Sequence, residues 1–343
     1  MKSIKKRMAG RRDSLISFGI VILAYIVIQI MISTGNISSS LKGQLVPICA
    51  YIVMAVSLNL TVGFLGELSL GHAGFMSVGA FTGIVVTTSL AQAIPSAPLR
   101  LAIAMIIGGI FAAVAGVIVG VPVLRLKGDY LAIVTLAFGE IIKNIINVLY
   151  IGMDGNGLHF SLLEQRFALE DGGKMIINGP MGVSGVTKIS SFTSGIILIL
   201  ITLFLILNLV HSRTGRAVMS VRDNRIAAES IGISATRYRL LAFVISAAFA
   251  GMAGTLYAMN FSTVTANKFD FNTSILVLVF VVLGGIGSLP GAMLGGLLIG
   301  IVQSGANTYI NSSMSDTFVY LILIVVLMIR PAGILGKNVG EKV

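Results

Sequence analysis

Residues 99–123 read LRLAIAMIIGGIFAAVAGVIVGVPV, an apolar run in which Arg100 is the one charged side chain. A helix of this length can cross the hydrocarbon core of a bilayer, which is about 30 Å thick. Comparable runs recur along the whole chain. The sequence therefore predicts an all-α, polytopic membrane protein of about ten transmembrane helices, some of them broken or re-entrant. The expected spans are residues 15–32, 44–62, 71–91, 99–123, 130–151, 193–211, 240–259, 274–289, 290–308 and 316–330.

The composition also indicates a membrane protein. Of the 343 residues, 56% are hydrophobic and only 11% are charged, whereas soluble domains average about 25% charged residues. Glycine accounts for 40 residues, and membrane helices use small residues to pack closely. The net charge of +11 does not indicate a nucleic-acid partner, because the charges lie between apolar segments rather than in a basic domain. The lipid bilayer is the partner that this pattern predicts.

The lysines and arginines predict the orientation of the chain. Ten crossings put both termini on one side, and that side holds 17 of the 24 lysines and arginines, against six on the other. Such an excess is typical of the cytoplasmic side. We therefore expect cytoplasmic termini, with a cytoplasmic tail at 1–14, an external loop at 152–192 and a cytoplasmic loop at 212–239.

The stretch 57–81, SLNLTVGFLGELSLGHAGFMSVGAF, combines many small residues with a few polar ones. Glycine permits sharp bends, and broken backbone inside a membrane is tolerated where it is buried or lines a cavity. Ionisable side chains there are candidates for function. The alternative is a tight turn at the membrane face, with Glu67 solvated and His72 in a structural role. The candidate pathway residues are Asn59, Gly63, Gly66, Glu67, Gly71, His72 and Gly74.

The stretch 128–150, GDYLAIVTLAFGEIIKNIINVLY, carries polar side chains inside an expected span. Glu140 and Lys143 are three residues apart and can pair on a helix, with Asn144 on the same face. A neutralised pair lowers the cost of holding charge in a membrane. These residues form either a polar face toward a pathway or another subunit, or an internal ion pair that fixes helix packing.

The cytoplasmic loop contains a short helix signal. Asp223 or Asn224 can cap a helix whose apolar face is Ile226, Ala227, Ala228 and Ile231, and Gly232 is a natural stop. A short capped helix across a loop has the shape that docks into a partner's groove. The alternative is an ordinary basic loop at lipid head groups. The candidate docking residues are Arg222, Asp223, Arg225, Ala227, Ala228, Glu229 and Gly232.

Motifs of enzyme chemistry do not occur in the sequence. It contains no GxxxxGK[ST] phosphate loop, no HExxH and no cysteine–histidine cluster. We therefore expect no catalytic residue, cofactor or metal, and any energy source must be another subunit or an ion gradient. The glycine-rich stretch 283–300, LGGIGSLPGAMLGGLLIG, contains two G-x-x-x-G spacings, which are common in membrane helices.

Together these stretches resemble the LivM-type permeases of branched-chain amino-acid ABC importers, over roughly 45–340. The resemblance is carried by SLNLTVGFLGELSLGHAGF (57–75), GDYLAIVTLAFGEII (128–142), NGPMGVSGV (178–186), the loop 215–254, GGIGSLPGAMLGG (284–296) and RPAGILG (330–336). It implies a single permease domain, 1–343, in a bacterial cytoplasmic membrane. The implied partners are a second, LivH-like permease, two ABC ATPase subunits, which the loop 212–239 would contact, and an external substrate-binding protein. Relatives with these motifs import leucine, isoleucine and valine, and some import urea or short amides.

One segment departs from the resemblance. Residues 152–177 are longer than the family's usual connection, and they include SLLEQRFALEDGG (161–173). Ser161 and Glu164 have the spacing of a capping box, and Gly172-Gly173 can end a helix. The segment therefore predicts a short external helix, either a neutral insert or a contact for the binding protein.

The sequence favours neither of two other classes of transport protein. A secondary transporter would carry inverted repeats and paired carboxylates at the membrane midplane. The carboxylates near the spans, Glu67, Asp129, Glu140 and Asp316, form no matched pair in two halves. A channel would need a ring of repeated polar residues at a constriction, and the sequence shows none. The sequence does not identify the substrate.

Overall fold

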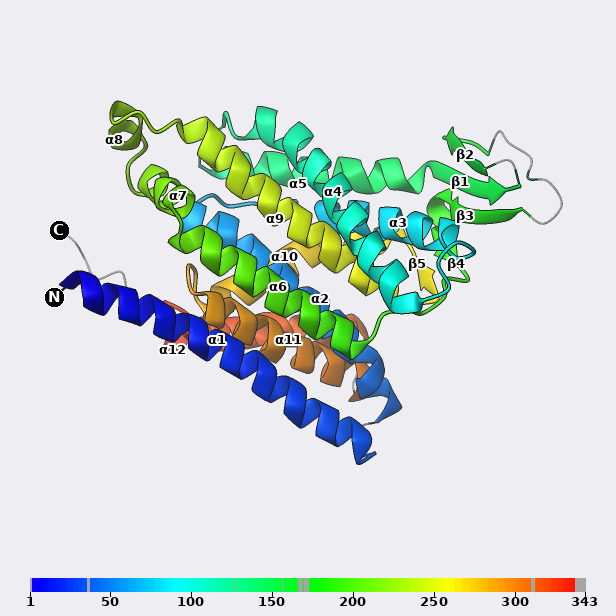
Figure 1. Cartoon of the computed structure of the whole chain (residues 1–343), viewed down its shortest axis with the longest axis horizontal. Helices are drawn as coiled ribbons and strands as arrows, with labels where there is room; N and C mark the ends of the chain where they lie inside the picture. The colour runs from blue at the N-terminus through cyan, green and yellow to red at the C-terminus, as the bar shows by residue number, and fades with distance from the viewer. Residues whose placement is uncertain are drawn as a thin grey trace. The chain divides into compact units, whose positions relative to one another are not determined.

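The computed structural model describes residues 2–35, 38–126, 128–155, 157–165, 169, 173–309 and 312–336, most of which are helical (Figure 1). The α-helices are α1 (Lys2–Ser33), α2 (Ser39–Asn59), α3 (His72–Ser89), α4 (Ala97–Val123), α5 (Asp129–Asn147), α6 (Phe192–His211), α7 (Arg213–Asp223), α8 (Arg225–Ser230), α9 (Ala235–Ala258), α10 (Phe271–Gly284), α11 (Leu289–Tyr309) and α12 (Ser312–Ile329). A π-helical turn, Leu60–Leu65, continues α2.

Each of the expected spans coincides with a helix. Among the described residues, four helices are long and apolar enough to cross a membrane by length and composition: Leu41–Leu65, Ala97–Val123, Phe192–His211 and Ala235–Ala258. Shorter apolar helices cover Ser17–Ser33, Phe271–Gly284, Leu289–Gln303 and Asp316–Ile329. The polytopic, mainly helical class is confirmed, and the crossing of a bilayer by ten of these helices stays a prediction.

The chain divides into two compact units. The first comprises the described residues of Met1–Gly66, Gly195–Tyr238 and Val277–Val343, and the second those of Glu67–Ser194 and Arg239–Leu276. Within the first unit α2 packs against α11, and α11 against α12. A methyl group on Gly300 of α11 would lie 2.9 Å from the Ile48 side chain of α2. Small residues therefore let these helices approach closely, as membrane helices require.

The second unit is built on α3, which packs against both α4 and α5. The closest approach is at Gly79 of α3, where any Cβ would overlap the Gly251 backbone of α9. The other side of α4 is exposed and apolar, including Ile106, Ile110 and Ile118. A helix with one small-residue face and one aliphatic face is typical of a membrane helix that packs inward and meets lipid outward.

The external loop expected at 152–192 contains strands, so the all-α prediction was incomplete. The strands are β1 (Leu149–Asp154), β2 (Gly157–Leu162), β3 (Lys174–Asn178), β4 (Val183–Ser184) and, after α9, β5 (Thr263–Val264). They form one antiparallel sheet with the order β2-β1-β3 and one β4-β5 pair. Figure 1 shows β1 following directly from the end of α5. Two 3₁₀ turns, Gly179–Met181 and Ala266–Phe269, complete the elements.

The short helix expected over 161–173 is wrong for its described residues. Ser161 and Leu162 belong to β2 and pair with Tyr150 and Leu149 of β1. Leu163 then takes a left-handed φ of +73°, which starts a turn instead of a helix. The Ser161 hydroxyl donates to the Glu164 carbonyl at 2.5 Å and closes that turn, so it does not cap a helix. The expected stop at Gly172 lies outside the described residues.

Two details of the first unit differ from the expected spans. The boundary between the expected spans 274–289 and 290–308 lies earlier, because α10 ends at Gly284 and α11 begins at Leu289. Pro290 therefore lies in the first turn of a helix, where proline is tolerated. The loop expected at 212–239 contains α7 in addition to the expected short helix. Ser212 caps α7, its hydroxyl accepting the Gly215 N–H at 3.1 Å.

Candidate functional site

The first part of the site is the end of α2, where Asn59 is completely buried. Its side-chain amide donates to the Ser288 carbonyl at 3.0 Å, and its side-chain oxygen accepts the Gly287 N–H at 2.9 Å. Both halves of the amide are therefore satisfied, as a buried polar group requires. Asn59 fixes the end of α2 to the loop between α10 and α11.

The π-turn after Asn59 lies against the same loop. A Cβ on Gly63 would lie 2.5 Å from the Gly287 nitrogen and 2.7 Å from its Cα, so only glycine allows this approach. The π-turn ends at Gly66, whose φ of +79° is left-handed. Turns of this π type are frequent at functional sites.

The C-terminal motif joins this cluster. The Ile334 and Leu335 N–H groups donate to the Leu283 and Gly284 carbonyls at 2.9 and 3.0 Å. These bonds satisfy carbonyls that the end of α10 leaves without helical partners. Three stretches that are distant in the sequence, 57–66, 283–288 and 333–336, therefore meet within the first unit.

Arg222, in the last turn of α7, reaches the π-turn. Its guanidinium donates through Nη1 to the Gly63 carbonyl at 3.0 Å. The other edge of the guanidinium donates to Asp223 Oδ1, through Nε at 3.1 Å and Nη2 at 3.0 Å. The aliphatic part of Arg222 lies over Gly66, where an added Cβ would be 2.6 Å from Arg222 Cγ.

The short helix α8 follows directly. Asn224 is its cap, because its side-chain oxygen accepts the Ala227 N–H at 3.0 Å. The Arg225 Nε donates to Glu229 at 3.0 Å, one turn along the helix. Gly232 follows with a left-handed φ of +84°, so the chain turns there as the sequence predicts.

The apolar face expected on α8 is divided. Ala228 is only 3% exposed and packs with Val221, Ile233 and Ala235 inside the loop. Ile226 and Ile231, in contrast, are 81% and 74% exposed. Ala227 is also exposed. Ala228 therefore holds α8 on its own loop, while the isoleucines are free to meet a partner.

In the second unit, Glu67 forms an ion pair with Arg239 of α9. The side chains are 16% and 5% exposed, so the pair is largely removed from solvent. Arg239 also donates to the Leu126 carbonyl at 3.5 Å. Glu67 is therefore not solvated in the structure, in contrast to the alternative of a solvated turn.

The glycines at the start of α3 serve close packing with α5. A Cβ on Gly71 would overlap the Thr135 carbonyl, and one on Gly74 would lie 2.9 Å from the Gly139 Cα. The Leu70 N–H donates to the Thr135 hydroxyl at 3.0 Å. His72 is buried at 2% exposure, edge-on to Phe75 with ring centroids 6.2 Å apart.

The polar residues of α5 form an internal contact. Glu140 and Lys143 form an ion pair, and the other Glu140 oxygen accepts the Phe271 N–H at 3.1 Å. Phe271 is the first residue of α10, so the carboxylate lies at the positive end of that helix. Asn144 is exposed on the same helix. This geometry matches an ion pair that fixes helix packing.

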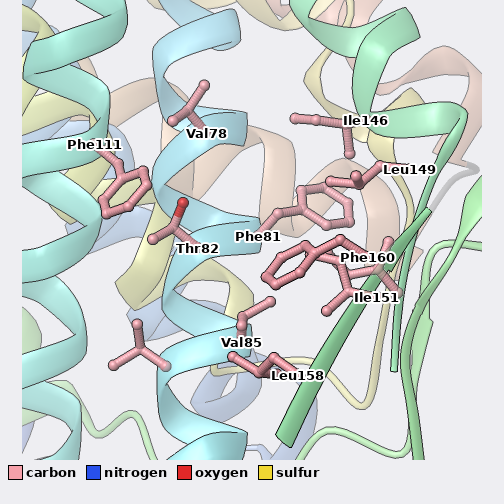
Figure 2. Close-up of a pocket in the computed structure, with 12 residues that line it drawn as sticks. Val78, Phe81, Thr82, Val85, Phe111, Ile146, Leu149, Ile151, Leu158 and Phe160 are labelled. Carbon is pink, nitrogen blue, oxygen red and sulfur yellow. The ribbon is translucent and has the colours of Figure 1, made fainter. Parts of the chain in front are cut away.

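A cavity of about 440 Å³ opens in the second unit between α3, α4, the end of α5 and the three-stranded sheet (Figure 2). Its lining residues are all aliphatic or aromatic except Thr82, and Figure 2 shows Phe81 of α3 close to Phe160 of β2. The charged amine and carboxylate of an amino acid would lose hydrogen bonds there. The cavity therefore suits hydrocarbon rather than a whole amino acid.

Residues 40–327 match the family model described as the permease component of branched-chain amino acid transport systems. The chain belongs to this permease family. It is 33% identical to the LivM permease protein of the high-affinity branched-chain amino acid transport system of Salmonella typhimurium strain LT2, over 92% of this chain and 74% of that protein. It is 36% identical to Escherichia coli K12 LivM, over 83% of this chain and 67% of that protein.

The permease is also similar to LivH permease proteins. It is 26% identical to the Salmonella typhimurium LivH permease protein, over 85% of this chain and 93% of that protein. No solved structure matches the chain. Within the described residues, no group of three or more histidine, cysteine, aspartate or glutamate side chains could hold a metal ion.

Sequence reasoning missed several residues of the permease site. The spacing of residues in the sequence indicates neither Arg239 as the partner of Glu67 nor Gly287 and Ser288 as the partners of Asn59. Their partners lie far away in the sequence, so no local spacing indicates them. The helix α7 had a local signal, because Ser212 precedes Ala217, Val218 and Val221 at helical spacing.

Proposed function

We propose that this permease is the membrane-spanning subunit of an ABC importer for branched-chain amino acids, and that it hydrolyses no ATP itself. The observation that carries the proposal is the similarity to LivM proteins over most of the chain, with a family match at 40–327. Those relatives are named for branched-chain amino acid transport. An importer of this kind draws its energy from separate ATPase subunits.

We propose ten crossings with both termini in the cytoplasm of a bacterial cell, the chain lying in the cytoplasmic membrane. Support comes from the helix found at each expected span. The side that holds the termini has 17 of the 24 lysines and arginines, and such an excess indicates the cytoplasmic side. This topology places α7 and α8 in the cytoplasm and the sheet β2-β1-β3 outside.

The proposed partners are a LivH-like permease, two ABC ATPases and an external substrate-binding protein. The second permease is supported by relatives of both types, LivM and LivH, that carry the name of the same transport system. The ATPase contact is assigned to α8. Its exposed Ile226 and Ile231 would be costly to leave in water and are suited to a groove of another protein.

The polar and glycine residues divide into two proposed roles. Asn59, Gly63 and Gly66 form bent backbone that can change shape during transport, because the π-turn interrupts the regular hydrogen bonding of α2. Glu67, Gly71, His72, Gly74, Glu140 and Lys143 hold the helices of the second unit together. Substrate choice then rests mainly on the external binding protein.

The test is uptake by the reconstituted complex. The permease would be purified with a LivH-like permease and ABC ATPases from the same organism, placed in liposomes, and supplied with a substrate-binding protein and ATP. We expect uptake of leucine, isoleucine or valine that requires ATP and stops with a hydrolysis-deficient ATPase. Uptake of urea or acetamide alone would show that the substrate is an amide and not a branched-chain amino acid. Uptake driven by an ion gradient without ATP would overturn the proposal.

A further inference from the structure

Arg222 lies at the point where the cytoplasmic helices meet the membrane helices of the first unit. It belongs to the last turn of α7, and Asn224, two residues later, caps α8. The backbone between Arg222 and the α8 cap is therefore one residue long. A displacement of α8 must move the end of α7, because Ala228 of α8 also packs on Val221 of α7.

The other end of the Arg222 side chain binds the π-turn. The Gly63 carbonyl lies in the last turn of the α2–π helix, where carbonyls lack helical partners and carry partial negative charge. A guanidinium at 3.0 Å from that oxygen makes a charge-assisted hydrogen bond. Asp223 occupies Nε and Nη2, which orients the planar group and directs Nη1 toward Gly63.

The π-turn passes the contact on to the loop between α10 and α11. Gly63 lies directly against Gly287, and Asn59, one turn earlier, binds Gly287 and Ser288. The glycines meet backbone to backbone and the Asn59 side chain is completely buried, so little slack is available between them. A continuous line of contacts therefore runs from α8 through Arg222 and Gly63 to residues 287–288.

We propose that Arg222 is a positioning residue that transmits movement of α8 to the π-turn at the end of α2. The inference rests on the proposed function, because it assumes that an ATPase moves α8. Arginine suits this role better than lysine, since its planar fork fixes the direction of Nη1 while Nε and Nη2 bind Asp223, whereas a lysine ammonium rotates freely. The aliphatic stem of Arg222 adds contact with Gly66.

The first test replaces the guanidinium in the full reconstituted complex. We expect Arg222→Gln to lower the amount of substrate imported per ATP hydrolysed by about tenfold, as for loss of one charge-assisted hydrogen bond. Arg222→Lys should recover part of that ratio. The matched control is Arg216→Gln, because Arg216 on the same helix also donates to a backbone carbonyl, His211 at 3.1 Å, but not to the π-turn. The Arg216→Gln complex should import as much substrate per ATP hydrolysed as the unaltered complex.

The second test links α7 to the π-turn by a disulfide bond in place of the Arg222 hydrogen bond. An ideal Cβ at Gly66 lies 3.7 Å from Arg222 Cβ, which is close to the separation of about 3.8 Å found in disulfides. In a Cys49→Ala background, Gly66→Cys with Arg222→Cys should form a disulfide on mild oxidation. We expect the reduced form to have the low ratio of Arg222→Gln and the oxidised form to regain a large part of it.

These experiments test the role of Arg222 separately from the importer assignment. Failure of the disulfide to form would show that α7 does not lie on the π-turn. A normal ratio in Arg222→Gln, or a low ratio in the oxidised pair, would show that the link does not transmit movement. An unaltered complex without ATP-driven uptake would instead overturn the importer assignment, whatever the disulfide shows.

Discussion

The carboxylate of Glu67 binds the guanidinium of Arg239, a residue 172 positions further along the chain. The pair joins the segment before α3 to the start of α9 inside the second unit. Both side chains are largely buried, so neither charge has bulk water to replace a missing partner. The contact therefore constrains the fold of this unit more than a surface ion pair would.

The first prediction concerns this pair. Glu67→Gln should lower the free energy of unfolding by about 3–5 kcal/mol, because it leaves the Arg239 charge buried without its counter-ion. Thermal unfolding of the purified permease in detergent measures the loss. Glu164→Gln is the control, since Glu164 is exposed. Equal melting temperatures for the two variants would contradict a structural role for the pair.

The second prediction concerns Gly71, where a methyl group would overlap the Thr135 carbonyl. Gly71→Ala should lower stability by about 1–3 kcal/mol through overpacking, and Gly71→Leu should abolish uptake because the second unit misfolds. Gly43→Ala is the control, because among the described residues nothing beyond the glycine's own helical backbone lies within 4 Å of the added methyl group. If Gly71→Leu gives a normal yield of stable protein that does not transport, Gly71 lines a pathway and does not serve packing.

The third prediction concerns topology. In a Cys49→Ala background, a cysteine at Glu164 should react with an impermeant maleimide added to intact cells. A cysteine at Arg237 should react only after the membrane is opened. Both positions are exposed in the structure, so access across the membrane is the variable. Labelling of both from the same side would exclude ten crossings with cytoplasmic termini.

The sequence predicted the features that depend on neighbouring residues. The helix at each expected span follows from apolar runs, and the Asn224 cap and Gly232 turn of α8 follow from a pattern of a few residues. The contact of Glu140 with Lys143 follows from helical spacing. In each case the partner atoms lie within one or two helical turns, so the spacing alone brings them together.

Other features depended on distant segments or on a competing signal. Nothing near Asn59 indicates Ser288, and nothing near Glu67 indicates Arg239. At 154–162 a usable local signal was overlooked. DGNG at 154–157 is typical of a hairpin turn, and Leu158, Phe160 and Leu162 alternate with polar residues as in a strand. Despite the capping-box spacing at Ser161, the segment forms a strand, because β1 supplies hydrogen-bond partners for its backbone.

The last prediction separates the two kinds of apolar residue on α8. Ile226→Ser together with Ile231→Ser should reduce the amount of ATPase that copurifies with the permease and reduce uptake. The melting temperature should change little, because both side chains are already in solvent. Ala228→Trp should instead lower the melting temperature as well, because the indole cannot fit between Val221 and Ala235.

Two controls make the comparison specific to α8. Leu163→Ser removes an aliphatic side chain that is 70% exposed on the proposed external side, and it should leave ATPase binding unchanged. Arg225→Ala should be milder than the isoleucine pair, because an exposed ion pair such as Arg225 with Glu229 contributes only about 0–1 kcal/mol. A full complement of copurified ATPase in the double isoleucine variant would show that the ATPase binds another surface. A low melting temperature in that variant would show that the isoleucines support the loop itself.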